Sequence, residues 1–230
     1  HVAVQDGLFE AQGLDVELVP FMSALERDTA MHSGQLDGYF GDLLATMLLI
    51  RNGVAMRIAT VSYATTPGQP MFAMLAAPGK EPVETVSVGI SRATIIEYVL
   101  DAMVDSGEQA DLALEYTEIK KIPIRMQMLL SGQIGSAVLP EPLATLAASQ
   151  GATILMTDEN LDMVLTVICL HNSRQEAFDP FRKAYEKAVQ MLNSNPESYR
   201  KLMAETCRIP PDLAADFPIY TYPEPFLPAV

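Results

Sequence analysis

The sequence predicts an α/β protein with two lobes, because one strand-to-helix unit is repeated and because short strands alternate with helices along the chain. The first copy, SGQLDGYFGDLLAT, covers residues 33–46, and the second, SGQIGSAVLPEPLAT, covers residues 131–145. Each copy has a Ser-Gly-Gln turn, a short strand, an acidic residue and the start of a helix. Ligands of open α/β sheets bind beyond the carboxyl ends of the strands, so the repeat indicates a ligand cleft between the lobes.

Capping signals and apolar periodicity define the elements of the first part of the chain. Ser23 and Glu26 have the spacing of a capping box, in which a hydroxyl and a carboxylate bind free amides at a helix start. The predicted elements are a strand over residues 16–20, a helix from 24 to 34, a strand over 36–40, a helix over 43–51 and a strand over 56–61. This alternation favours a mostly parallel sheet flanked by helices in each lobe.

A connector rich in Pro and Gly, residues 77–82, separates this pattern from a second one. Beyond it we predict strands over residues 86–90, 112–119, 153–156 and 164–170, helices over 95–103 and 125–130, and two tail helices that begin near Asp179-Pro180 and Asn195-Pro196. We assign residues 1–77 and 168–230 to the first lobe and residues 83–163 to the second. Residues 78–82 and 164–167 are the expected hinge crossovers.

The composition fits a globular protein and excludes several partners. The 230 residues are 49% hydrophobic and 19% charged, which excludes a disordered chain. No apolar run approaches the ~20 residues that a membrane helix needs. The net charge of −14, with no basic cluster larger than Lys120-Lys121, argues against a nucleic-acid partner, because phosphates need a basic surface.

The motifs of common nucleotide-dependent and hydrolytic enzymes are missing from the sequence. It contains no Walker A motif, no Gly-x-Gly-x-x-Gly after a strand and no Gly-x-Ser-x-Gly. Cys169 and His171 are the only Cys and His residues that lie close together in the sequence, which is too few for a zinc site. We expect no metal and no cofactor. We interpret Cys169 as an inert core residue. The two cysteines, Cys169 and Cys207, either form one disulfide or stay unbonded.

Four segments carry a resemblance to a known family. They are VAVQDGLF at residues 2–9, GLDVELV at 13–19, SGQLD at 33–37 and Glu141-Pro142. In their order and spacing, from His1 to about Asn195, the chain resembles the solute-binding proteins of ATP-binding-cassette importers, in the branch that binds sulfonates, taurine, nitrate and thiamine-pyrimidine precursors. The resemblance implies a type II periplasmic-binding fold, a hinge of two crossing strands, a small-molecule ligand trapped by closure of the lobes, and a membrane permease as partner.

The resemblance also implies a periplasmic or other extracytoplasmic location, often with a lipid anchor. Because the chain begins with His1, we expect a processed or trimmed form, and we expect a monomer. The sequence departs from the family in three respects. The family usually has a strand before the segment that matches Val2, and this chain starts after it, so either that strand was trimmed or the sheet lacks it. Gly135 replaces the usual Asp after the second Ser-Gly-Gln, and there is no Trp of the kind that often lines the cleft. These departures leave the ligand class open.

Candidate ligand contacts of the first lobe lie at a helix start, at a strand end and in a loop. Ser23 is primarily a cap, and core packing explains Phe40 as well as a ligand contact does. Asp42 either accepts a bond from an amine or caps the following helix, which its residue type favours. The loop that contains Thr66, Gly68 and Gln69 either offers hydroxyl and amide donors to a ligand or forms a plain turn. The full set is Ser23, Phe40, Gly41, Asp42, Thr66, Gly68 and Gln69.

The second lobe contributes Ser91, Arg92, Thr94 and Glu141 as candidates. The first three open a helix, where free amides and the positive end of the helix dipole favour an anion. Ser91 also has the residue type of a helix N-cap. For Arg92, exposure to solvent and contact with a ligand are equally expected. Since Glu is a poorer cap than Asp, we favour Glu141 over Asp42 as a ligand or hinge residue.

Together these features predict a non-enzymatic solute-binding protein that traps a small polar organic ligand, anionic or zwitterionic, by hinge closure. The alternative is an enzyme on the same fold, similar to dehydratases of the menaquinone pathway or to pyrimidine-precursor synthases. A synthase would need clustered Cys and His for iron, which this sequence lacks. A dehydratase would need a general acid or base, for which Glu141 and Asp42 are the candidates.

Overall fold

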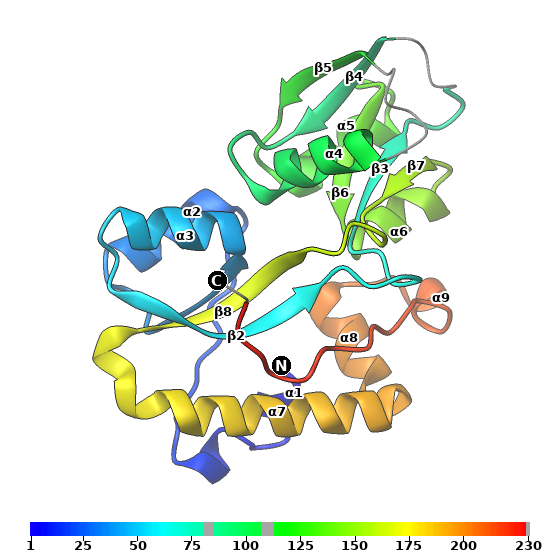
Figure 1. Ribbon diagram of the computed structural model, residues 1–230. Helices are drawn as coiled ribbons and strands as arrows, with labels where there is room; N and C mark the ends of the chain where they lie inside the picture. The colour runs from blue at the N-terminus through cyan, green and yellow to red at the C-terminus, as the bar shows by residue number, and fades with distance from the viewer. Residues whose placement is uncertain (81–84, 107–112, 229–230) are drawn as a thin grey trace. The chain divides into compact units, whose positions relative to one another are not determined.

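The computed structural model describes residues 1–80, 85–106 and 113–228. The chain divides into two compact units, which we describe separately (Figure 1). The first unit combines His1–Ala64 with Val164–Val230, and the second unit is Thr65–Met163. Each unit contains one sheet with helices packed on it, so the predicted α/β class with two lobes is confirmed.

The sheet of the first unit has the order β1-β8-β2, formed by β1 (Gly38–Asp42), β8 (Val164–His171) and β2 (Met56–Ala64). Both pairs of neighbours are antiparallel, so the prediction of a mostly parallel sheet is wrong for these strands. The chain leaves the unit after β2 and returns along β8, which therefore runs against both neighbours. Since β1 and β2 share one direction and are joined by α3 (Leu43–Arg51), the predicted strand-helix-strand unit is present with β8 inserted in it.

The sheet of the second unit has the order β5-β4-β6-β3-β7. Its strands are β3 (Phe72–Ala76), β4 (Thr85–Ile90), β5 (Ala113–Glu118), β6 (Ser136–Pro140) and β7 (Thr153–Thr157). The strand β4 pairs in parallel with β5 and β6, whereas β3 is antiparallel to β6 and β7. The parallel part of the sheet therefore lies on the β5-β4-β6 side, and its carboxyl edge is formed by the ends of those strands.

The boundary between the units differs from the predicted lobe boundary. Because β3 pairs with β6 and β7, residues 65–77 belong to the second unit and not to the first. The chain passes between the units after Ala64 and after Met163, so the crossovers are not at 78–82 and 164–167. Residues 81 and 82 of the first predicted crossover lie outside the described residues, and residues 164–167 begin β8.

The predicted strand over residues 16–20 is absent from the described structure, in which residues 14–21 form neither helix nor strand. Val16 packs near Phe9 in a small apolar cluster, but Leu18 and Val19 are 45% and 51% exposed. A strand needs a hydrogen-bonded neighbour, and none of the described strands pairs with this segment. The alternation of apolar residues was therefore insufficient to define a strand here.

Helices cover the sheets of both units. They are α1 (Val2–Gln5), α2 (Ala24–His32), α3, α4 (Ile95–Ser106), α5 (Ile122–Leu130), α6 (Leu143–Ser149), α7 (Phe178–Ser194), α8 (Arg200–Cys207) and α9 (Pro211–Ala214), with 3₁₀ turns η1 (Glu10–Gln12), η2 (Asn172–Ala177) and η3 (Pro196–Tyr199). In the first unit α7 packs on α1 and β2, and the rings of Phe9 and Phe181 stack at 5.2 Å. None of the described helices combines the length and apolar character of a membrane span.

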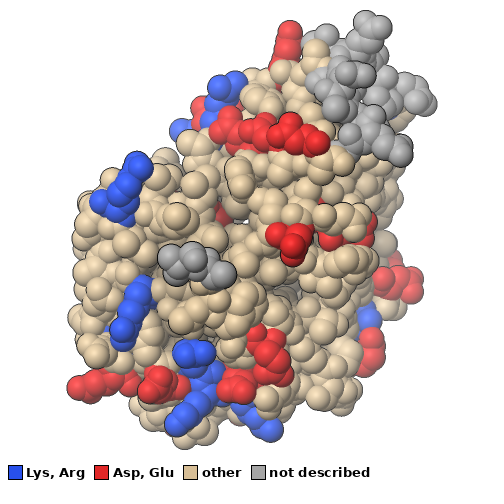
Figure 2. Space-filling view, viewed as in Figure 1, with Lys and Arg blue, Asp and Glu red and all other residues tan. Residues whose placement is uncertain are grey.

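The helix α4 shows how burial selects the faces of these helices. Its apolar residues Ile95, Ile96, Val99, Leu100 and Met103 are buried, as the sequence predicts. Acidic side chains gather on the surface over the part of the second unit where α4 lies, while both charge signs follow the region of α7 in the first unit (Figure 2). The helix therefore presents its charged face to solvent and its apolar face to the sheet.

Cys169 lies in the core of the first unit, where it packs with Val61 and Val167 and has no exposed surface. Burial raises the pKa of its thiol to about 12, so the group is neutral and unreactive at ordinary pH. Cys207 is exposed and is not bonded to Cys169. The interpretation of Cys169 as a core residue is confirmed.

The repeated sequence is also a structural repeat, made of α2-β1-α3 in the first unit and α5-β6-α6 in the second. Gly34 and Gly132 have φ of 73° and 71°, the left-handed conformation that ends many helices. The amides of Gln35 and Gln133 then donate to Ala30 and Met128 at 3.0 and 2.9 Å, closing the same Schellman turn in both units. The Ser-Gly-Gln motif is therefore a helix stop that leads directly into a strand.

This turn predicts different effects for two glycines that lie three residues apart. Gly132→Ala places a side chain in the left-handed region and should lower the free energy of unfolding by about 1 kcal/mol. At Gly135 the φ is not positive, and the nearest atom to an added Cβ is the Ser87 carbonyl oxygen at 3.7 Å, an ordinary contact. Gly135→Ala should therefore change stability by less than about 0.5 kcal/mol. Urea unfolding of both variants tests the assignment, which is contradicted if the two costs are equal.

Candidate functional site

The acids of the repeat both cap the helices that follow them. Asp42 Oδ1 accepts a bond from the amide of Ala45 at 2.7 Å. Glu141 Oε2 accepts from the amide of Thr145 at 3.2 Å, and its Oε1 accepts from the Thr145 hydroxyl at 2.8 Å. The prediction of a capping role is confirmed for Asp42. Glu141, favoured by the sequence as a ligand or hinge residue, binds a first-turn amide of α6 from the position before the N-cap residue Pro142. A ligand contact for it stays a prediction.

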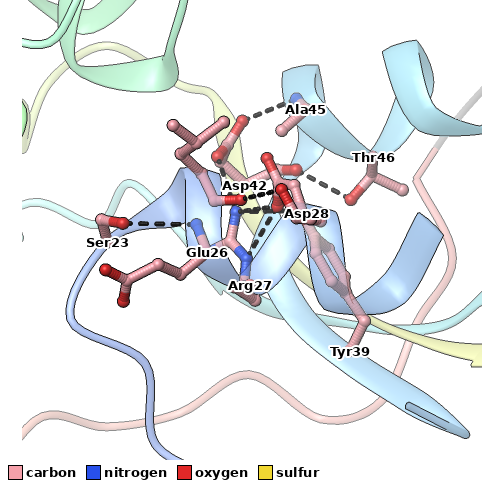
Figure 3. A network of polar contacts seen from close by, with 10 residues as sticks. Ser23, Glu26, Arg27, Asp28, Tyr39, Asp42, Ala45 and Thr46 are labelled. Atoms are coloured by element: carbon pink, nitrogen blue, oxygen red, sulfur yellow. Dashed lines mark hydrogen bonds and ion pairs between the residues drawn. The ribbon is translucent and has the colours of Figure 1, made fainter. Parts of the chain in front are cut away.

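A polar network joins α2, β1 and the start of α3 in the first unit (Figure 3). The guanidinium of Arg27 donates to Asp28 Oδ1 at 2.8 and 3.0 Å and to the hydroxyl of Tyr39 at 2.9 Å. It also lies 3.6 Å from Asp42 Oδ2 and 4.6 Å from the centre of the Tyr39 ring. The sequence gives no sign of Arg27, because its partners Tyr39 and Asp42 lie in another element of the fold, β1.

Burial controls the ionisation of this network. It raises the pKa of Asp42, against the opposing effects of the Ala45 amide and of Arg27. Burial also raises the pKa of Tyr39 above its usual range, so that its hydroxyl stays protonated. Arg27 is thus a cation held between two carboxylates, Asp28 and Asp42, and its charge is compensated within the unit.

The other candidates of the first unit have clear local roles. Ser23 Oγ accepts from the Glu26 amide at 3.3 Å, which confirms its prediction as a cap, while Glu26 binds the Met22 amide. Phe40 is 59% exposed and so is not a core residue. An added Cβ at Gly41 would lie 2.2 Å from the ring of Tyr39, so the bare backbone of Gly41 accommodates that ring.

The start of α4 in the second unit differs from the prediction. Thr94, not Ser91, supplies the cap, because its Oγ1 accepts from the Ile96 amide at 3.2 Å while its hydroxyl donates to the Ser91 carbonyl at 2.8 Å. Glu97 binds the Ala93 amide at 2.6 Å. Ser91 is only 6% exposed, and its hydroxyl oxygen accepts a bond from Arg125. The interpretation of Ser91 as an N-cap is wrong, since its hydroxyl bonds the Arg125 guanidinium and Thr94 provides the cap.

Arg125 is a buried charged residue near the start of α4 that the sequence reasoning missed. It lies on α5 with no exposed surface, beneath the carboxyl edge of the parallel strands. Burial lowers the pKa of its guanidinium to about 10, so the group remains charged at neutral pH. Its position within the mostly apolar run IPIRMQMLL is the one signal that marks it in the sequence. Arg92, by contrast, is exposed, with its guanidinium 5.4 Å from the centre of the Tyr116 ring.

The loop before β3 is anchored by two acids of the second unit. Asp158 is fully buried, and its Oδ1 accepts from the amides of Met71 and Phe72 at 2.8 and 3.0 Å. Glu159 accepts from the Gly68 amide at 2.7 Å. The loop contains a turn in which the Gln69 amide donates to the Thr66 carbonyl at 3.0 Å.

The predicted site residues therefore form three groups. Ser23, Phe40, Gly41 and Asp42 lie around the Arg27 network, Ser91 and Thr94 lie at the start of α4, and Thr66, Gly68 and Gln69 lie in the loop held by Asp158 and Glu159. Glu141 is close to the third group, because its amide donates to the Met71 carbonyl at 2.8 Å. Arg92 is the candidate whose side chain joins no group. In the described part of the chain, no three His, Cys, Asp or Glu residues are placed to hold a metal ion.

Known structures share this fold along nearly the whole chain. The alkanesulfonate-binding protein SsuA from Xanthomonas axonopodis pv. citri, bound to MOPS, aligns over 97% of this chain and 80% of its own, with a TM-score of 0.73 and 16% identity. The periplasmic aliphatic sulphonate binding protein SsuA from Escherichia coli aligns over 100% of this chain and 77% of its own, with the same TM-score and identity. The ligand binding component of an ABC-type import system from Staphylococcus aureus, with zinc bound, aligns over 94% and 79%, with a TM-score of 0.72 and 16% identity.

A scan against protein-family models and a search of curated protein sequences gave no match. The structural comparisons nevertheless show that the chain has the periplasmic-binding-protein fold. The fold that the resemblance implies is therefore confirmed.

The contact between Gly41 and Tyr39 can be tested by a double-mutant cycle. Gly41→Ala should lower the free energy of unfolding by about 1–3 kcal/mol, because the added methyl overlaps the Tyr39 ring. In a Tyr39→Ala background the same substitution should cost much less, since the overlapping ring is gone. Urea unfolding of the four proteins gives the coupling. An equal cost of Gly41→Ala in both backgrounds would contradict this contact.

The buried carboxyls predict a pH dependence of stability. Burial raises the pKa of Asp42, Glu141 and Asp158 in the folded state, so the folded protein binds more protons than the unfolded chain between the ordinary and the raised pKa values. Stability then falls as pH rises through that window. We expect the urea midpoint to increase as the pH is lowered from neutral towards the ordinary pKa of a carboxyl, about 4.

Asp158→Asn provides the control for this pH effect. Asn keeps an oxygen that accepts from the Met71 and Phe72 amides but has no titrating group. The variant should therefore show a weaker increase of the urea midpoint on acidification. A wild-type midpoint that falls between these pH values, or an unchanged slope in Asp158→Asn, would exclude the effect.

Proposed function

We propose that the protein is the solute-binding component of an ABC-type importer. One observation carries the proposal, the fold it shares with import proteins over 94% to 100% of its length. In this proposal a small polar organic ligand is trapped when the two units close on it, and it is then delivered to a membrane permease. The protein would act outside the cytoplasm, as a monomer, with lipid anchoring as one way of holding it at the membrane.

Ligand-driven closure needs a ligand that binds the closed state more tightly than the open state. Polar groups at the strand ends of each unit suit this purpose, because hydroxyl, amide and carboxylate groups that cap a helix can also bind a polar ligand. The loop of Thr66, Gly68 and Gln69 and the start of α4 are the segments of the second unit that we assign to this role. In the first unit we assign it to the end of β1, with Ser23, Phe40, Gly41 and Asp42.

The local charges support an anionic or zwitterionic ligand. Arg125 provides a buried cation near the start of α4, and the helix dipole adds to its field. Asp42 and Glu141 supply carboxylate oxygens that accept bonds from an ammonium group. Sulfonates of the kind named for the similar structures are one class that fits the cationic end.

An enzyme on the same fold is the second candidate, and the raised pKa of Glu141 is the observation that favours it. Burial, with a smaller effect of Asp158, raises the pKa of this carboxyl, a shift that also suits a general acid or base. Incubation with a bound compound, followed by mass spectrometry, separates the two functions. A binding protein returns the compound unchanged, whereas a dehydratase returns a product that has lost water.

The import function predicts thermal stabilisation by a small ligand. A panel of sulfonates, amino acids, pyrimidines and inorganic anions should include compounds that raise the melting temperature. At a concentration a hundredfold above the dissociation constant, a ligand should add about 2.7 kcal/mol to the free energy of unfolding. Differential scanning calorimetry checks this, with neutral amides of matched size as controls. An unchanged melting temperature with every compound of the panel would contradict the proposal.

A further inference from the structure

Arg125 is a buried cation without a compensating anion. Its side chain has no exposed surface, and within residues 1–80, 85–106 and 113–228 no carboxylate forms an ion pair with it. The comparison with Arg27 is direct, since that guanidinium lies between Asp28 and Asp42. Burial of an unpaired charge is costly, so an uncompensated guanidinium in a core requires a physical explanation.

The bonds of Arg125 fix it at the edge of the parallel strands. Its Nε and Nη2 donate to the Ile119 carbonyl at 3.1 and 2.6 Å, and its Nη1 donates to the Val138 carbonyl at 2.9 Å. Nη2 also donates to the hydroxyl oxygen of Ser91. Ile119 directly follows β5 and Ser91 directly follows β4, so the guanidinium connects two neighbouring strand ends.

Within the described ranges, no acceptor is found for the hydroxyl proton of Ser91, whose oxygen accepts from Arg125. Because the oxygen already accepts from a cation, the hydroxyl hydrogen must point elsewhere. In the described part of the chain, Ser91 makes one other bond, in which its backbone carbonyl accepts from Thr94. The hydroxyl is therefore a nearly buried donor, in a residue that is 6% exposed, and it lies just before the first turn of α4.

We propose that Arg125 is a positioning residue for an oxyanion, a carboxylate or a sulfonate, at the head of the ligand. Arg125 orients the Ser91 hydroxyl as a donor to that oxyanion and supplies the positive field that the oxyanion compensates. The ligand touches Ser91, while Arg125 stays behind it and acts through it. This inference rests on the proposed binding function and specifies the ligand group that the second unit recognises.

Two independent features support the same group. The first turn of α4 carries the positive end of a helix of 12 residues, which favours a negative charge. The nearly buried hydroxyl donor and the uncompensated guanidinium behind it do not depend on that helix dipole. A neutral ligand would satisfy the donor but would leave the charge of Arg125 unbalanced, so the site discriminates in favour of an acid.

The experiment compares charged and neutral probes of the same shape. Methanesulfonate and acetate are titrated against methanesulfonamide and acetamide, with MOPS as a larger sulfonate, by calorimetry on the full chain. We expect at least one oxyanion to bind the wild-type protein at least tenfold more tightly than its neutral counterpart. Ser91→Ala and Arg125→Met should each reduce that preference at least tenfold, and Ser91→Thr, which keeps the hydroxyl, should restore it.

Lys121→Met is the matched control, because it removes one positive charge from an exposed position at the start of the same helix. It should change oxyanion affinity less than threefold, and an equal loss in Lys121→Met and Arg125→Met would overturn the proposal. If Arg125→Met does not fold, Ser91→Ala and Arg125→Lys carry the test. Binding of neutral compounds with no preference for oxyanions would overturn this inference and leave the import function intact. If no compound of the thermal-stabilisation panel binds, both this inference and the proposed import function are contradicted.

Discussion

The free amides at the start of each helix are the constraint on which this structure depends. Each strand that leads into a helix brings those amides to the carboxyl edge of a sheet, where they need partners. Asp42 accepts a hydrogen bond from an amide at the start of α3, and Glu141 does the same for α6. At the start of α4 the acceptors are Thr94 and Glu97. Since ligands of α/β folds bind at this edge, the same side chains hold the fold together and border the candidate site.

This constraint explains why local features could be predicted from the sequence. The Ser-Gly-Gln turns, the Ser23 and Asp42 caps and the buried face of α4 all depend on contacts between residues no more than five positions apart. Hydrogen bonds over such short separations are set by backbone geometry, and the sequence pattern is sufficient to identify them. Ser91 was assigned wrongly for the opposite reason, since its partner Arg125 lies 34 residues away.

Strand directions and unit boundaries depend on pairing between distant segments, and here the sequence was insufficient. The prediction of parallel sheets assumed that strands adjacent in sequence are neighbours in a sheet. In the first unit β8 is inserted between β1 and β2, and in the second unit β3 lies between β6 and β7. Residues 16–20 alternate like a strand, but none of the described strands pairs with them. Periodicity shows which face is apolar and does not identify the partner.

Two arginines, half-buried Arg27 and fully buried Arg125, distinguish the two units chemically. Arg27 is neutralised by Asp28 and Asp42, so the end of β1 has no cationic charge to offer a ligand. Arg125 is held by carbonyl and hydroxyl oxygens alone, which stabilise its hydrogen-bond donors but leave its charge uncompensated. A carboxylate in place of Ser91 would neutralise Arg125 and would repel an acidic ligand. A hydroxyl at this position satisfies one donor and keeps the positive field, so Ser91 suits recognition better than it would suit stability alone.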